Sequence, residues 1–145
     1  MDLRLQLYSE LFLKITRGNY RGVFSNAKPI YLLALIDSIP FLKFNKIKLE
    51  IKLLNDLYST NLSKYDPNCK ASLTLPFFHL DTEPFYELVW KSNERPKTHA
   101  HTPSAKYLRE YLEYAKLDDD LWMLLQDEEN RKYLRGCIIN HYFAQ

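Results

Sequence analysis

The sequence predicts a mostly helical α+β fold. Apolar residues recur at helical spacing in several segments along the chain, and two aromatic, β-prone runs stand close together between residues 73 and 90. With 46% hydrophobic and 26% charged residues, the chain has the composition of a protein that folds around its own core. Its 145 residues match the usual size of one domain, so we expect residues 1–145 to form a single domain.

Periodicity and turn residues divide the first half of the chain. Three segments have helical spacing, and the second is almost free of charge and bounded by Pro29 and Pro40, which suit the start and the end of a helix. Two glycines and two arginines cluster before it and predict a loop. In chain order we expect a helix over residues 3–18, a loop over 17–22, a helix over 29–39, a half-buried strand over 44–49, a helix over 50–58 and a polar loop over 61–72.

The second half is predicted to begin with strands and to end in helices. The aromatic runs 73–80 and 84–90 flank a short polar segment and predict a β-hairpin. After a polar connection, carboxylates stand where they suit helix N-termini. We expect helices over residues 104–115, 118–125 and 127–142. This order predicts a winged-helix-like core, with the hairpin as a β-hairpin wing and with additional C-terminal helices.

Composition narrows the class of protein. The sequence has neither an apolar run long enough to cross a membrane nor the pattern of a secretion signal, so we expect a cytoplasmic protein without a membrane partner. Cys69 and Cys137 are far apart and lack a Cys-x-x-Cys partner, which argues against a disulfide framework or a zinc site. Residues 1–53 carry nine Lys and Arg against four Asp and Glu, a net +5. That excess favours a phosphate-facing surface, with an ordinary solvated face as the alternative.

The sequence lacks the groupings that common catalytic mechanisms need. Asp37 and residues 50–52 have the spacing of one metal-dependent nuclease motif, but they fall on separate predicted helices. His99, His101 and His79 are candidate metal ligands without a supporting thiol or acid. Neither a Gly-x-Ser-x-Gly motif nor a phosphate-binding glycine loop occurs. We therefore expect no enzymatic activity, no cofactor and no bound metal.

Four segments of the sequence, taken together and in their order along the chain, indicate a resemblance to a known family. They are KPIYLLALID (residues 28–37), LPFFHL (75–80), PSAKYLRE (103–110) and the closing run 124–143. Together they resemble the sulfur-binding, phosphorothioate-DNA-binding domain of type IV restriction endonucleases and the N-terminal domains of related HNH endonucleases. The resemblance implies a restriction-modification role and duplex DNA binding. It also implies a shallow apolar cavity that holds the sulfur against a proline ring, with basic or imidazole groups on neighbouring phosphates.

The resemblance assigns roles to individual residues. Pro103 matches the proline that contacts sulfur, with Thr102, Ser104 and Ala105 as walls. Sulfur is larger, softer and less strongly hydrated than oxygen, so an apolar cup favours it. Thr102 stands where the family often has an aromatic residue, and the His101 ring is the substitute. The candidate phosphate contacts are His79, Arg17, Arg21, Lys28 and Arg95.

We therefore expect a DNA-binding module that recognises phosphorothioate-modified duplex DNA without cutting it. Because no HNH motif occurs before Gln145, cleavage would require a nuclease domain or subunit in trans. Two alternatives stay open. One is a binder of unmodified DNA or of a different modification, and the other is a protein-interaction subunit of a restriction or defence system. The aromatic hairpin would supply the anchors of that subunit, namely Phe77, Phe85, Tyr86 and Trp90.

Overall fold

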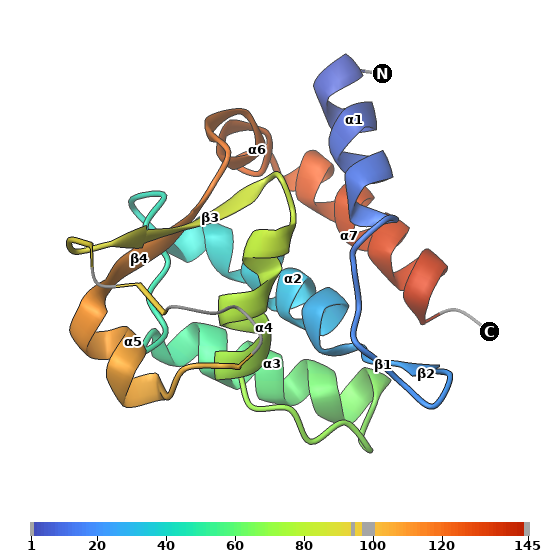
Figure 1. The fold of residues 1–145 in the computed structure, drawn as a ribbon. Coiled ribbons are helices and arrows are strands. Elements are labelled where there is room, and N and C mark those ends of the chain that lie inside the picture. The colour runs from blue at the N-terminus through green and yellow to red at the C-terminus, as the bar shows by residue number, and fades with distance from the viewer. Residues whose placement is uncertain (1, 94, 97–100, 144–145) are drawn as a thin grey trace.

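The computed structural model describes residues 2–93, 95–96 and 101–143 (Figure 1). Helices dominate, and the strands form two small antiparallel pairs, so the predicted mostly helical α+β class is confirmed. The elements are α1 (Leu3–Phe12), β1 (Asn19–Tyr20), β2 (Val23–Phe24), α2 (Ala27–Ser38), α3 (Lys52–Tyr65), α4 (Thr74–His79), β3 (Tyr86–Trp90), α5 (Ala105–Tyr111), β4 (Leu112–Leu117), α6 (Asp119–Leu124) and α7 (Glu128–Tyr142). Short 3₁₀ turns, Ile39–Phe41 and Leu80–Thr82, follow α2 and α4.

Helix α2 is the centre of the core. All its residues except Asp37 are buried, as expected of a helix with a single charge in its apolar run. Helices α3, α4 and α7 pack around it, and α1 lies along α7 (Figure 1). Asp37 accepts a hydrogen bond of 3.0 Å from Nε of Arg135 on α7. Its half-buried carboxylate is thereby part of an ion pair. Among the described residues, no helix is both long and apolar enough to cross a membrane.

The larger strand pair joins distant parts of the chain. Strand β3 pairs antiparallel with β4, with Tyr86 opposite Leu117 and an irregularity between Val89 and Trp90. The strand predicted over residues 44–49 is reduced to one bridge, in which Ile47 and Ala115 exchange backbone hydrogen bonds of 2.7 and 2.8 Å. The second half of the chain is thereby tied to the segment that follows α2.

The hairpin predicted over residues 73–90 is wrong, and so is a wing at those positions. Residues 74–79 form helix α4, and the partner of β3 is β4 instead. Pro76 lacks the N–H that a strand ladder needs but fits the first turn of a helix. Phe77 and Phe78 are both buried, whereas alternation would expose one of two neighbours. The apolar run alone does not distinguish a strand from a buried helix.

Other boundaries differ because tertiary pairing overrides local pattern. Helix α1 ends at Phe12 rather than near Gly18, and the predicted loop 17–22 contains part of the β1–β2 hairpin. Its turn has positive φ at Arg21 (52°) and Gly22 (83°), which suits a two-residue hairpin turn. Two predicted boundaries are also wrong: α3 continues to Tyr65 through the start of the predicted loop, and α5 gives way to β4 at Leu112.

Candidate nucleic-acid interface

A shallow hollow lies between the base of the β1–β2 hairpin and helix α4. Its volume is about 390 Å³. Three of the candidate phosphate contacts, Arg17, Lys28 and His79, line it, although they come from separate parts of the chain. Its other lining residues are Thr16, Gly18, Ser25 and Leu75. We call this site the His79 hollow.

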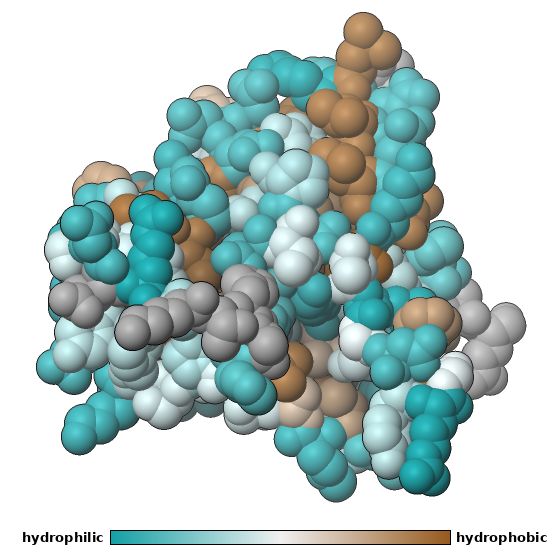
Figure 2. All heavy atoms as spheres, viewed as in Figure 1, coloured by the Kyte–Doolittle hydropathy of each residue, from teal (hydrophilic) through white to brown (hydrophobic). Residues whose placement is uncertain are grey.

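The surface on the side of α4 is suited to a polar ligand. Figure 1 shows α4 at the front of the molecule, and in the same view Figure 2 shows mostly hydrophilic residues. The clearest apolar strip in that view follows α1, where Leu3 is 80% and Leu7 50% exposed. The lining of the His79 hollow includes the polar side chains of Thr16, Arg17, Ser25, Lys28 and His79, which suit a nucleic-acid ligand.

The imidazole of His79 joins two segments that are distant in sequence. His79 ends α4, and its Nε2 lies 2.9 Å from the Oγ1 of Thr102, in a hydrogen bond to which either group can donate. Thr102 directly precedes Pro103 at the start of α5. The edge-to-face contact with Phe78, with ring centroids 4.9 Å apart, also holds the imidazole. The predicted sulfur-contacting proline and the predicted phosphate-contacting histidine thus belong to one local structure.

The four residues predicted to form the sulfur cup lie at the beginning of α5. Ser104 caps this helix, because its hydroxyl accepts a hydrogen bond of 3.1 Å from the Tyr107 backbone N–H. Pro103 and Ala105 are half-buried, whereas Thr102 and Ser104 are exposed. The cap fixes the backbone directly after Pro103, and the hydrogen bond between Thr102 and His79 fixes the residue directly before it.

Lys28 lies on the floor of the His79 hollow and is held by internal acceptors. Its Nζ donates to the carbonyl oxygen of Thr16 at 2.6 Å and to Oγ1 of Thr82 at 3.1 Å. The side chain of Glu83 accepts from the Thr16 backbone N–H at 3.2 Å and from the Thr82 hydroxyl at 2.7 Å. Burial lowers the pKa of Lys28, and the carboxylates of Glu83 and Asp81 oppose that shift. Both backbone groups of Thr16 are thereby fixed directly before Arg17.

Arg17 is rigidly positioned. Its guanidinium lies 5.0 Å from the ring centroid of Phe24 and 4.9 Å from that of Tyr142. Its Nη1 donates to Oδ1 of Asn26 at 3.1 Å. These contacts restrict the side chain and leave further N–H donors for a ligand.

The other predicted cations are not part of the His79 hollow. Arg21 is exposed in the turn of the β1–β2 hairpin, with its guanidinium 5.3 Å from the ring centroid of Tyr20. Arg95 and His101 are exposed between β3 and α5, and the described contacts do not join them to the hollow. His99, a candidate metal ligand, is outside the described residues. Within the described part of the chain, no three His, Cys, Asp or Glu residues are grouped so that they could hold a metal ion.

The aromatic anchors predicted for a protein partner are mostly in the core, so that prediction is wrong. Phe77 and Phe85 are fully buried, and Tyr86 is 3% exposed. The Tyr86 hydroxyl donates to the Phe77 carbonyl oxygen at 2.5 Å and lies 3.0 Å from the Tyr31 hydroxyl. Trp90 is half-buried. Phe77, Phe85 and Tyr86 therefore pack within the core and are not available as anchors for another protein.

Sequence reasoning missed the residues that complete the hollow. Thr16, Ser25 and Leu75 carry no signal of their own, because small and apolar residues are common in any fold. A lysine directly before a long apolar helix indicates that it needs buried acceptors, but it does not identify Thr16 and Thr82 as those acceptors or Glu83 as their partner.

The comparisons with known proteins bear on the fold. No protein-family model matches the chain, and no curated protein matches it significantly. Among solved structures, the chain is similar to one described as the sulfur binding domain and SRA domain of ScoMcrA complexed with phosphorothioated DNA, with a TM-score of 0.71 and 15% sequence identity. The similarity covers 94% of this chain and 42% of the other, so this chain spans less than half of that chain's length. At this identity the likeness establishes the fold, and we conclude that the chain has a fold that occurs in that DNA complex.

Proposed function

We propose that the chain is a DNA-binding module that recognises phosphorothioate-modified duplex DNA. The observation that carries the proposal is the hydrogen bond between His79 and Thr102. It joins two of the four segments that carry the family resemblance, residues 75–80 and the start of residues 103–110, and His79 lines one hollow with the cations Arg17 and Lys28. The similar solved structure contains phosphorothioated DNA, which supports the same class of ligand for this fold.

Phosphate binding would use the His79 hollow. Arg17 supplies a guanidinium held by two rings, and Lys28 supplies a charge beneath it. Charge-assisted hydrogen bonds from such groups are stronger than neutral ones, and fixed side chains lose little entropy when a phosphate arrives. Phosphate contacts position DNA without reading its sequence. Arg21 and Arg95 would add contacts at the periphery.

Sulfur recognition would use the apolar surface at the start of α5. Pro103 and Ala105 offer carbon atoms to a poorly hydrated sulfur, and His101 and Ser104 border them. The hydroxyl of Thr102 is already bonded to His79. Covering a satisfied hydroxyl costs less free energy than covering one that loses a water partner, so Thr102 can serve as a wall of the cup.

The module would bind and not cut. Asp37, one of the carboxylates considered for a nuclease site, is paired with Arg135 in the structure, and Glu50 is exposed before α3. In this proposal a nuclease domain or subunit acting in trans would cut the DNA, as part of a restriction system.

A titration of matched duplexes tests the proposal. Fluorescence anisotropy would follow two random-sequence duplex pools, identical except for phosphorothioate linkages in one, at several salt concentrations. We expect tighter binding of the phosphorothioate pool, and affinity for both pools that falls as salt rises because phosphate contacts release counterions. Equal binding of the two pools would identify a binder of unmodified DNA. If neither pool binds at about 50 mM salt, where such contacts are strong, DNA binding is refuted.

A further inference from the structure

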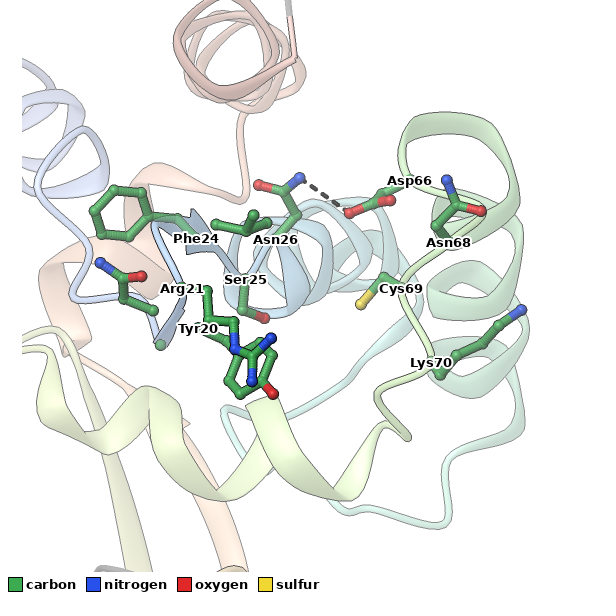
Figure 3. A pocket seen from close by; sticks show the side chains of 12 residues that line it. Tyr20, Arg21, Phe24, Ser25, Asn26, Asp66, Asn68, Cys69 and Lys70 are labelled. Atoms are coloured by element: carbon green, nitrogen blue, oxygen red, sulfur yellow. Dashed lines mark hydrogen bonds between the residues drawn. The ribbon is translucent and has the colours of Figure 1, made fainter.

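A second and larger cavity lies on the other side of the β1–β2 hairpin. It is a groove of about 840 Å³ between the hairpin and the segment that follows α3. Figure 3 shows Tyr20 and Arg21 on the hairpin side, with Cys69 and Lys70 across from them. None of these four residues lines the His79 hollow. We call this cavity the hairpin groove.

The lining of the hairpin groove combines apolar surface with positive charge. Tyr20 is 71% and Val23 72% exposed, although both are apolar enough to be expected in a core. Arg21 stands on the hairpin side, with its guanidinium 5.3 Å from the ring centroid of Tyr20, and Lys70 lies on the opposite side with its side chain directed away from the hairpin. An exposed aromatic ring with a guanidinium beside it suits a nucleobase that has left its stack, together with its phosphate. The volume of the groove lies in the range of small-molecule sites.

The acidic group in the groove does not oppose an anion strongly. Among the described residues that line the groove, Asp66 is the only acid, and its Oδ2 accepts a hydrogen bond of 3.1 Å from Nδ2 of Asn26. Arg17 donates to the same amide, so this carboxylate is part of an ordered network. Arg21 and Lys70 therefore outnumber the acid in the groove.

The backbone gives independent support for the importance of Arg21. Its φ of 52° lies in the left-handed region, which Asn or Gly adopts more readily than Arg. Gly22, with φ of 83°, is the residue expected there, and its N–H is held by Oδ1 of Asn19 at 2.9 Å. An arginine in this turn therefore has an unfavourable backbone conformation, and it places an exposed charge at the groove.

The two cavities are neighbours across the base of the hairpin. Gly18 and Ser25 line both, and the Ser25 N–H donates to the Gly18 carbonyl at 2.7 Å. A strand whose phosphate occupies the His79 hollow can therefore pass an adjacent nucleotide into the hairpin groove. We propose that the hairpin groove takes one unstacked nucleotide of the bound DNA strand, with its base against Tyr20 and its phosphate at Arg21. This inference rests on the proposed DNA binding.

The test compares a perfect duplex with the same duplex carrying one extrahelical adenine, because a base that is already unpaired enters the groove at the lowest cost. Both duplexes are unmodified, and binding is followed by fluorescence anisotropy for the full chain. Stacking of one base on an aromatic side chain corresponds to about fivefold in affinity or more. We expect the bulged duplex to bind at least about fivefold more tightly, and Tyr20→Ala to remove that preference. Phe44→Ala is the matched control, because Phe44 is 67% exposed and lines neither cavity.

The outcomes separate this inference from the proposed function. If wild type binds both duplexes equally, or if Tyr20→Ala weakens both to the same degree, the groove does not take an unstacked base, while duplex binding stands. If the preference persists in Tyr20→Ala, another part of the surface holds the base and the inference fails. If neither the perfect nor the bulged duplex binds, the inference fails, and the phosphorothioate pool of the titration above decides whether the proposed function stands. A preference that is lost in Tyr20→Ala and kept in Phe44→Ala supports the inference.

Discussion

Removal of one buried hydroxyl should lower the stability of the fold that positions the proposed DNA site. In Tyr86→Phe, the carbonyl of Phe77 and the hydroxyl of Tyr31 each lose their contact with the Tyr86 hydroxyl. Tyr31 and Tyr86 are buried, and burial raises the pKa of each phenol, as expected of polar groups away from water. An unsatisfied buried polar group costs about 1–3 kcal/mol, so the loss of two contacts should lower the free energy of unfolding by about 2–6 kcal/mol. That is a large share of the stability of a small protein.

Urea denaturation followed by circular dichroism measures the change. Tyr133→Phe is the control, because Tyr133 is 39% exposed on α7 and its substitution should change the free energy of unfolding by less than about 0.5 kcal/mol. In the double variant Tyr31→Phe, Tyr86→Phe, the second substitution removes a hydroxyl that has already lost its partner. The double variant should therefore be more stable than the sum of the single effects predicts. A loss below about 0.5 kcal/mol in Tyr86→Phe would refute the reasoning.

Three further predictions concern selectivity, pH and catalysis. Pro103→Ala should reduce affinity for phosphorothioate duplexes more than for unmodified ones, whereas Arg21→Ala should weaken the binding of both duplexes equally. A thermal melting curve checks that Pro103→Ala is folded. If the folded variant loses the same affinity for both duplexes, the assignment of Pro103 to sulfur binding is wrong. Burial and Asp118 raise the pKa of Tyr8 from 10.0 to about 12, so its contribution to stability is complete below pH 10 and is lost as the pH rises towards 12. The urea midpoint should accordingly fall between pH 10 and 11, and a constant midpoint would oppose this assignment. Supercoiled plasmid incubated with the chain and Mg²⁺ or Mn²⁺ should stay intact, and nicking that disappears in Glu50→Ala would reveal a metal site that we did not recognise.

Several elements could be predicted because one signal dominated each of them. Helix α2 is almost wholly apolar and has Pro29 in its first turn, so its sequence pattern predicts a buried helix. Helix α7 begins after Asp127, whose side chain accepts from the Glu129 and Asn130 backbone N–H groups, as the acidic run in the sequence indicated. The burial of α2 and the capping of α7 agree with the tertiary structure, so these local signals were sufficient.

Helix α4 and strand β4 could not be predicted in the same way. Residues 73–80 are apolar in a manner that fits both a strand and a buried helix, and only packing against α2 distinguishes them. The segment Leu112–Leu117 has a helical pattern up to residue 115, but it is extended because β3 offers it a partner. Both outcomes depend on contacts between residues far apart in the chain.

The candidate site was predictable by residue type and not by arrangement. Arg17, Lys28, His79 and Pro103 were identified from charge and from the resemblance. Their relation depends on two long-range contacts, one between His79 and Thr102 and one between Lys28 and Thr82, which no periodicity encodes. The buried Glu83 network is invisible in the sequence for the same reason.

The most direct test of the central claim is to determine which residues of the protein contact DNA. Amide chemical-shift changes in an NMR titration with a short phosphorothioate duplex would locate the contact residue by residue. We predict the largest changes at residues 16–18, at His79 and at residues 102–107, with small changes along α1 and α7. Changes confined to α1 and to residues 41–44, or no changes at saturating duplex, would contradict the assignment of the His79 hollow and the start of α5 as the DNA interface.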